Sequence, residues 1–383
     1  MNGKNPQHKW RFHHPSMAPT VQGTPLPVGV QVIGDYDGEL DPYPRIDVQT
    51  ANVLQRARAF AIVQRPSLTE AACPSCERSN IYDIYDGNSG QHIFFAKERS
   101  ECGWRFCCAP YHALFLDFKL STGIPPQMYF MTDLDVLPTH MTMEREGCRC
   151  PGCRCPGCCT CSPEYCSDGM FLHAGPLRPG LDPGYLKGNG PNCVGFAQEP
   201  RFGGGFTPTL NIMERAAADS DAEAPAWNAL AKIEGPACFG GCLELCCSSR
   251  FSVSSLSAQT LDVGLHRVGD LAEIVKRKPT DLLSYLRELA TDADVYTLQF
   301  SPHAHLAPQQ KATILASLLL ADYMFFERDT PPCSRAGCNL CNVWCCGCVC
   351  PLSIVCCLND RVQNEGASGG GGGGYSSGFV ADQ

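Results

Sequence analysis

The sequence predicts a mainly β protein with one strongly apolar helix near its C-terminal end. The chain of 383 residues contains 37 glycines and 30 prolines, a composition that favours many turns between short strands. Residues 311–326, KATILASLLLADYMFF, are apolar on every side of a helix, which is typical of a helix enclosed by protein or by lipid. Hydrophobic residues make up 44% of the chain, enough to build a sizeable core.

The strand signals begin with a hairpin. Residues 81–85 and 92–97 are apolar and aromatic runs on either side of Asp-Gly-Asn-Ser-Gly, a sequence typical of a tight turn. In contrast, two Pro- and Gly-rich stretches, 121–140 and 167–227, are expected to form long loops with a few short strands. Further regular segments are expected as strands at 111–120, 229–234, 251–256, 271–275 and 295–300, with an amphipathic helix at 279–290.

The composition divides the chain into three parts. Residues 1–45 are rich in Pro, Gly and polar residues and are expected to be a disordered leader that could carry a motif for protein partners. Residues 46–328 are expected to form the folded domain. Residues 329–383 are expected to be a Cys-rich and then Gly-rich tail.

The apolar helix is short for a membrane span. Sixteen residues reach about 24 Å, whereas the hydrocarbon core of a bilayer is about 30 Å thick. An acidic residue such as Asp322 near the bilayer centre would cost about 2.5–3.5 kcal/mol on insertion scales. We therefore expect a helix buried inside the protein, with Leu315, Leu319 and Phe326 fully buried, and keep membrane insertion as the alternative.

Charge and motifs exclude some functions. The net charge of −9 argues against a nucleic-acid-binding protein that depends on overall charge. No arrangement of residues resembles a hydrolase triad. The sequence leaves open whether the chain is an enzyme. The sequence does not predict an oligomeric state.

Cysteine is the unusual residue, with 27 copies. The first residues show no secretory signal, so we expect a reducing compartment, where disulfides are rare. The cysteines are then buried thiols, metal ligands or sites of lipid attachment. The densest run, at 148–161, suits S-acylation or a metal–thiolate cluster, and a zinc site is suggested by the spacing of Cys73, Cys76, Cys102 and Cys107.

Several segments, in order along the chain, resemble the phospholipid scramblase family. They include the hairpin with the paired cysteines that follow it (81–110), the Cys-rich segment at 141–161, and PGLDPGY at 179–185. The block LAKIEGPACFGGCLELCC begins at residue 230, and TDADVYTLQF at 291–300 is followed by the apolar helix. The resemblance covers about 80–327, and the Cys-rich tail and the Cys73–Cys76 pair depart from it.

The resemblance implies a closed, tubby-like barrel of about twelve antiparallel strands around the apolar helix. It implies an ATP-independent lipid translocator that moves membrane phospholipids in both directions at the cytoplasmic face of the plasma membrane, rather than a classical enzyme. It also implies palmitoylation of the Cys-rich run, at Cys153, Cys155, Cys158 and Cys159. The alternatives are an acylated lipid-binding adaptor without transport, or a zinc or metal–thiolate protein on the same fold.

The resemblance further implies a calcium site that begins at Asp292 and Asp294. A strong EF-type loop needs Gly at its sixth position and a bidentate carboxylate at its twelfth, where this chain has Thr297 and His303. We therefore expect weak calcium binding if the site is occupied. The alternative is that the two aspartates only end the helix before them.

Overall fold

The structure is a computed structural model. It describes residues 45–65, 79–100, 112–147, 167–178, 180–190, 192–216, 226–243, 247–256, 270–277, 295–326, 333–334, 337–345 and 347–354. The expected leader and the helix expected at 279–290 lie outside these residues, apart from Arg45.

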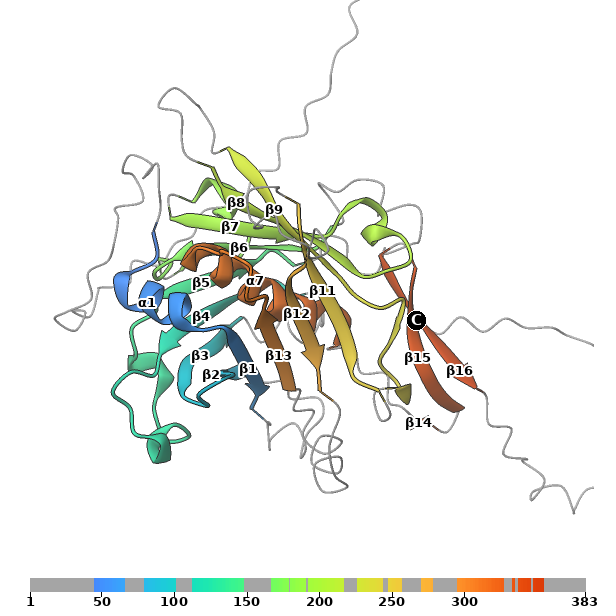
Figure 1. The fold of residues 1–383 in the computed structure, drawn as a ribbon, viewed down its shortest axis with the longest axis horizontal. Coiled ribbons are helices and arrows are strands. Elements are labelled where there is room, and N and C mark those ends of the chain that lie inside the picture. The colour runs from blue at the N-terminus through green and yellow to red at the C-terminus, as the bar shows by residue number, and fades with distance from the viewer. Residues whose placement is uncertain are drawn as a thin grey trace, which may run out of the picture.

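Twelve of the described strands close into one antiparallel barrel (Figure 1), which confirms the predicted fold class. Around the barrel the order is β1-β13-β12-β11-β9-β8-β7-β6-β5-β4-β3-β2. The strands are β1 (Ala59–Gln64), β2 (Ile81–Asp86), β3 (His92–Arg99), β4 (Leu114–Leu120), β5 (Met141–Arg145), β6 (Gly169–Ala174), β7 (Cys193–Gln198), β8 (Thr209–Arg215), β9 (Trp227–Glu234), β11 (Ser249–Ser255), β12 (Asp270–Lys276) and β13 (Val295–Phe300).

The predicted hairpin is present as β2 and β3, paired from Ile81 opposite Lys97 to Tyr85 opposite His92. Its turn ends at Gly90, whose φ of 71° lies in the left-handed region that glycine adopts without steric cost. Residues 167–227, expected to form long loops with a few short strands, contain β6, β7 and β8, which are full strands of the barrel.

Among the described residues, two α-helices accompany the barrel. Helix α1 (Val48–Arg56) begins after Asp47, whose carboxylate accepts hydrogen bonds from the N–H groups of Gln49 and Thr50. Helix α7 (Pro308–Ala321) continues into a π-helical turn (Asp322–Phe326). It runs through the barrel and packs against β6, β7, β8 and α1 (Figure 1).

The expectation of a buried helix is confirmed. Every residue of α7 from Lys311 to Ala321 is buried, and the apolar side chains of the helix join those of the strands in one core. Leu315 and Leu319 are fully buried, whereas Phe326 is only partly buried, so full burial of Phe326 was a wrong prediction. Phe326 lies at the end of the helix, where its ring packs near Phe239, Phe251 and Tyr296.

A second, smaller sheet joins part of the Cys-rich tail to the barrel. It contains β10 (Cys238–Phe239), β14 (Cys333–Ser334), β15 (Gly337–Cys345) and β16 (Cys348–Ile354). A disulfide joins Cys238 to Cys341, with Cα atoms 6.0 Å apart. The expectation that the cysteines are free thiols, metal ligands or acylated is therefore wrong for this pair, because pairing of β10 with β15 brings together residues 103 positions apart.

Candidate functional site

The C-terminal end of the core helix is held by a buried carboxylate. Asp322 accepts hydrogen bonds from the hydroxyl of Tyr82 on β2, at 2.8 Å, and from the hydroxyl of Tyr296 on β13. All three side chains are buried. Because a buried charge is costly unless it is hydrogen-bonded, these contacts fix the end of the helix against two strands that are far apart in the sequence.

A second buried carboxylate lies beside the first. Glu98 on β3 accepts a hydrogen bond from the hydroxyl of Tyr323, at 3.0 Å, and its other oxygen lies 3.0 Å from Nε2 of His112. Burial alone would raise the pKa of Glu98, but hydrogen bonding and charge interaction with His112 lower it overall. The Glu98 carboxylate is therefore stabilised in its charged form inside the protein.

A buried ion pair extends the polar cluster. Arg145 on β5 donates from Nε to Asp168, at 3.2 Å, and from its terminal nitrogen to the other carboxylate oxygen. The Arg145 guanidinium also lies 5.4 Å from the centre of the Tyr323 ring, at cation–π distance. The pair is fully buried, so removing either partner alone would leave an uncompensated charge in the interior.

Buried histidine–carboxylate pairs recur in the barrel wall. His92 lies 2.9 Å from Asp83, and His173 lies 2.8 Å from Glu144. Among the described residues, the Nδ1 atoms of His92, His112 and His173 have no hydrogen-bond partner. Each ring therefore contacts its carboxylate through Nε2, an arrangement that positions neighbouring strands.

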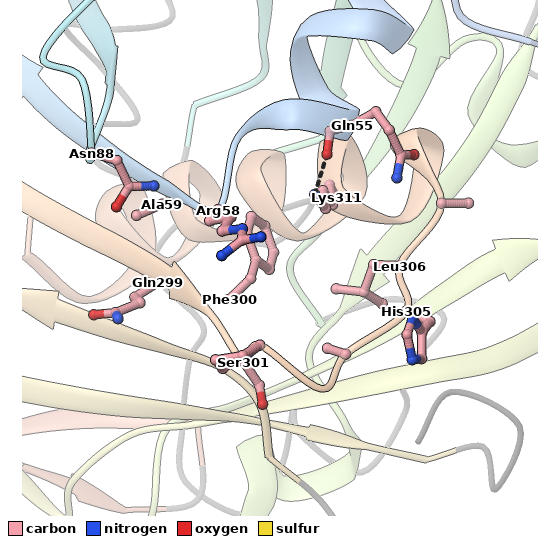
Figure 2. Close-up of a pocket in the computed structure, with 13 residues that line it drawn as sticks. Gln55, Arg58, Ala59, Asn88, Gln299, Phe300, Ser301, His305, Leu306 and Lys311 are labelled. Carbon is pink, nitrogen blue, oxygen red and sulfur yellow. Dashed lines mark hydrogen bonds between the residues drawn. The ribbon is translucent and has the colours of Figure 1, made fainter. Parts of the chain in front are cut away.

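The N-terminal end of the core helix borders a solvent pocket of about 710 Å³ (Figure 2). The ammonium of Lys311 donates to the carbonyl oxygens of Leu54, Gln55 and Ala57 at 2.9–3.2 Å. Burial lowers the pKa of Lys311, and the neighbouring Arg58 lowers it further. The pocket lining mixes polar groups such as Arg58, Gln299 and His305 with the apolar Leu306.

Most residues predicted from the sequence as functional sites lie outside the described part of the chain. These are the proposed acylation sites Cys153, Cys155, Cys158 and Cys159, the calcium residues Asp292 and Asp294, and the zinc candidates Cys73, Cys76, Cys102 and Cys107. Within the described ranges, no group of three or more His, Cys, Asp or Glu side chains is arranged to hold a metal ion.

The strand directions relate these segments to one another. Because neighbouring barrel strands are antiparallel, successive connections alternate between the two barrel ends. One end of the barrel, which we call the cysteine end, is the end where the chain leaves β1, β3, β5 and β12 and enters β2, β4, β6 and β13. The β9–β11 connection, which contains β10 and its disulfide, belongs to the same end.

The described helices also bear on membrane insertion. None of them combines the length and apolarity needed to cross a bilayer. Helix α7 contains 14 residues and is enclosed by the barrel, so its apolar surface is already covered by protein.

Sequence reasoning missed the polar groups that surround the helix ends. Asp322 and its partner Tyr82 are 240 positions apart, and no local motif marks such a pair. One signal was available: Asp322 is a single acidic residue in an otherwise apolar helix, and a buried acid requires donors.

Comparison with known proteins identifies relatives. The family model described as Scramblase matches residues 226–328, which contain β9, β11, β12, β13 and α7. Human phospholipid scramblase 1 is 26% identical over 251 residues, 66% of this chain and 58% of the relative. Human phospholipid scramblase 2 is 26% identical over 66% of this chain and 63% of the relative, and mouse phospholipid scramblase 1 is 25% identical over 68% and 59%.

The matched region spans only about 58–63% of the length of these relatives. No solved structure matches the chain. The matched segment contains the apolar core helix and four of the twelve barrel strands, β9, β11, β12 and β13. The chain is similar to phospholipid scramblases over these segments.

Proposed function

We propose that this chain is a phospholipid scramblase, which moves phospholipids in both directions between membrane leaflets without ATP. The observation that carries the proposal is the Scramblase match over the segment that contains the core helix and the barrel strands β9, β11, β12 and β13. The curated relatives named phospholipid scramblase support it over two thirds of the chain. We further propose that it acts at the cytoplasmic face of the plasma membrane.

The test is a transport assay with the full chain in phospholipid vesicles that contain a fluorescent lipid in both leaflets. A reductant that cannot cross the membrane bleaches about half of the signal in intact vesicles, and more if lipids exchange between leaflets. We expect bleaching beyond the outer-leaflet fraction without ATP. Bleaching equal to that of protein-free vesicles, with protein incorporation verified, would rule out intrinsic scrambling.

An adaptor without transport is the second candidate, and the structure gives a specific reason to keep it. The barrel interior is filled by α7 and by strand side chains, so a lipid has no place inside the barrel while the helix is enclosed. Lipid transport would then follow the outside of the barrel. The adaptor binds vesicles in the same preparation but leaves the leaflets unmixed.

Acylation is the proposed means of membrane attachment. The strands β5 and β6, which flank the segment with Cys153, Cys155, Cys158 and Cys159, meet it at the cysteine end. Two or more acyl chains are needed for stable anchoring. Replacing the four cysteines with Ala is expected to move the protein off cell membranes by removing its stable anchor, so that only weak, reversible binding remains. Stoichiometric zinc together with no mass loss on hydroxylamine treatment would favour the metal–thiolate alternative.

We propose that the protein binds calcium with low affinity. Asp292 and Asp294 supply two carboxylates, too few for a tight site of the EF type. We expect a dissociation constant of about 10⁻⁴–10⁻³ M, as in low-affinity modules. Calorimetry on the full chain tests this, and micromolar binding that disappears in Asp292→Ala would contradict it.

A further inference from the structure

The connection between β4 and β5, residues 121–140, carries an exposed apolar patch. Within nine residues, the side chains of Met128, Phe130, Met131 and Val136 are 45%, 76%, 78% and 74% exposed. Single exposed apolar residues are common, but a cluster of this kind marks a binding surface. We call these four residues the flank patch, because the connection lies at the outer edge of the molecule beside β2 and β3 (Figure 1).

The connection is ordered by residues that turn inward. The Tyr129 ring lies 4.5 Å from the His92 ring and 5.7 Å from the Phe95 ring, between centres. The Tyr129 carbonyl oxygen accepts a hydrogen bond from Arg65, and Leu134 is buried. Tyr129 and Leu134 therefore attach the connection to the barrel wall, while their neighbours point away from it.

The backbone of the connection is also supported locally. The hydroxyl of Thr132 donates to the carbonyl oxygen of Met128 at 2.7 Å, and the Asp133 carboxylate accepts from the N–H of Asp135. The Arg65 guanidinium lies 5.2 Å from the centre of the Phe130 ring. The patch is therefore presented in a fixed shape, which lowers the entropy lost on binding.

Most of the charges beside the patch are paired. Arg65 forms a two-pronged ion pair with Asp83, at 2.7 Å for both contacts, and Lys97 pairs with Asp135 at 2.7 Å. The exposed Asp133, between Met131 and Val136, adds one carboxylate, so the surface offers apolar side chains with a small negative charge beside them. Such a surface matches the electrically neutral interface of a zwitterionic bilayer, where aromatic and aliphatic side chains enter the headgroup and acyl boundary.

We propose that the flank patch inserts into the interface of a phospholipid bilayer and holds the barrel on its side against the membrane. This inference rests on the proposed action on phospholipids, because that function brings the barrel to a lipid surface. A protein partner is the competing occupant. The patch residues project from an irregular connection as separate side chains, a form that suits insertion among lipids.

The experiment uses the full chain made without acylation and vesicles of phosphatidylcholine alone. The test variant is Phe130→Ser/Met131→Ser/Val136→Ser. The matched control is Phe206→Ser. Phe206 is 70% exposed and lies in the β7–β8 connection at the cysteine end, whereas the β4–β5 connection begins at the opposite end of the barrel. Thermal unfolding verifies that both variants are folded.

We expect the triple variant to lose vesicle partitioning by at least about tenfold, equivalent to about 1.4 kcal/mol. The control and the wild type should partition equally, with little change on addition of salt. A Phe130→Trp variant should be quenched by brominated acyl chains beyond the quenching of the native tryptophans. Equal partitioning of the triple variant and wild type, or a changed oligomeric state with unchanged partitioning, would overturn the inference.

The outcome is separable from that of the proposed function. Loss of vesicle binding in the triple variant together with no scrambling by the wild type supports the patch and rejects transport. Scrambling by a triple variant that partitions as well as wild type supports transport and rejects the patch.

Discussion

The two ends of helix α7 are held by different chemistry. At the N-terminal end, Lys311 donates to backbone carbonyls at the end of α1 and just after it, beside a solvent pocket. At the C-terminal end, Asp322 and Tyr323 contact buried side chains from distant strands, and the tail residue Trp344 covers Phe325. The comparison shows that the C-terminal end is locked from several directions, so movement of the helix would begin at its N-terminal end.

The largest loss of stability is expected from replacing Trp344, the tail residue that packs against the C-terminal end of helix α7. Trp344 is fully buried, its ring lies 5.0 Å from that of Phe325, and its indole N–H donates to Gly203 at 2.8 Å. Trp344→Ala should lower the free energy of unfolding by about 3–5 kcal/mol. Urea unfolding measures this.

The matched control is Leu352→Ala in the same small sheet, because Leu352 is exposed. Its effect should stay within about 0.5 kcal/mol. An equally small effect of Trp344→Ala would mean that the tail is not part of the core.

The next largest effect is expected at Asp322. Asp322→Ala removes the acceptor of two buried tyrosine hydroxyls and should cost about 3 kcal/mol. A double-mutant cycle with Tyr82→Phe isolates one of the hydrogen bonds. Additive free energies in that cycle would show that Tyr82 and Asp322 do not interact in solution.

Acid should first weaken the contacts at the C-terminal end of helix α7, where Tyr323 donates to Glu98. Burial alone would raise the pKa of Glu98 from 4.5, but His112 lowers it. A lowered pKa in the folded state stabilises the protein above pH 4.5, and this contribution is lost as the pH falls through the folded-state pKa. Glu98→Gln should therefore flatten the loss of stability between neutral and acid pH, measured by urea unfolding, and an unchanged slope would contradict the assignment.

Alkaline pH should change the stability of the protein through Lys311, at the N-terminal end of helix α7. Burial and Arg58 lower the pKa of Lys311 below 10.5, so the charged form is disfavoured in the folded state. Stability should rise as the pH increases from the folded-state pKa of Lys311 toward 10.5, because the unfolded chain then binds more protons. Lys311→Met should remove this rise and cost about 1 kcal/mol at neutral pH through lost hydrogen bonds. A retained alkaline rise in the variant would assign the effect to another group.

Local signals predicted some elements well. The turn sequence before Gly90 predicted the β2–β3 hairpin, and the all-round apolarity of 311–326 predicted an enclosed helix. These elements depend on neighbours in the sequence, where period and turn chemistry are informative. The helix itself begins at Pro308, where proline suits the first helical turn.

Contacts between distant residues could not be predicted in the same way. The strands β6 and β7 each contain a glycine, and β6, β7 and β8 lie between Pro- and Gly-rich connections, so the sequence pattern indicates mostly loops, while closure of the barrel requires full strands there. The Cys238–Cys341 disulfide and the Tyr82–Asp322 hydrogen bond depend on tertiary pairing. For the candidate site, sequence reasoning predicted the resemblance to a family but none of the buried polar partners.

The central claim is that α7 remains enclosed while the protein acts on membranes. The most direct measurement is amide hydrogen exchange of residues 308–326, with the full chain free in solution and bound to phosphatidylcholine vesicles. The account predicts equally slow exchange in both states, with new protection confined to the β4–β5 connection. Fast exchange in α7 on vesicles, beginning near Lys311, would show that the helix leaves the barrel and would contradict the account.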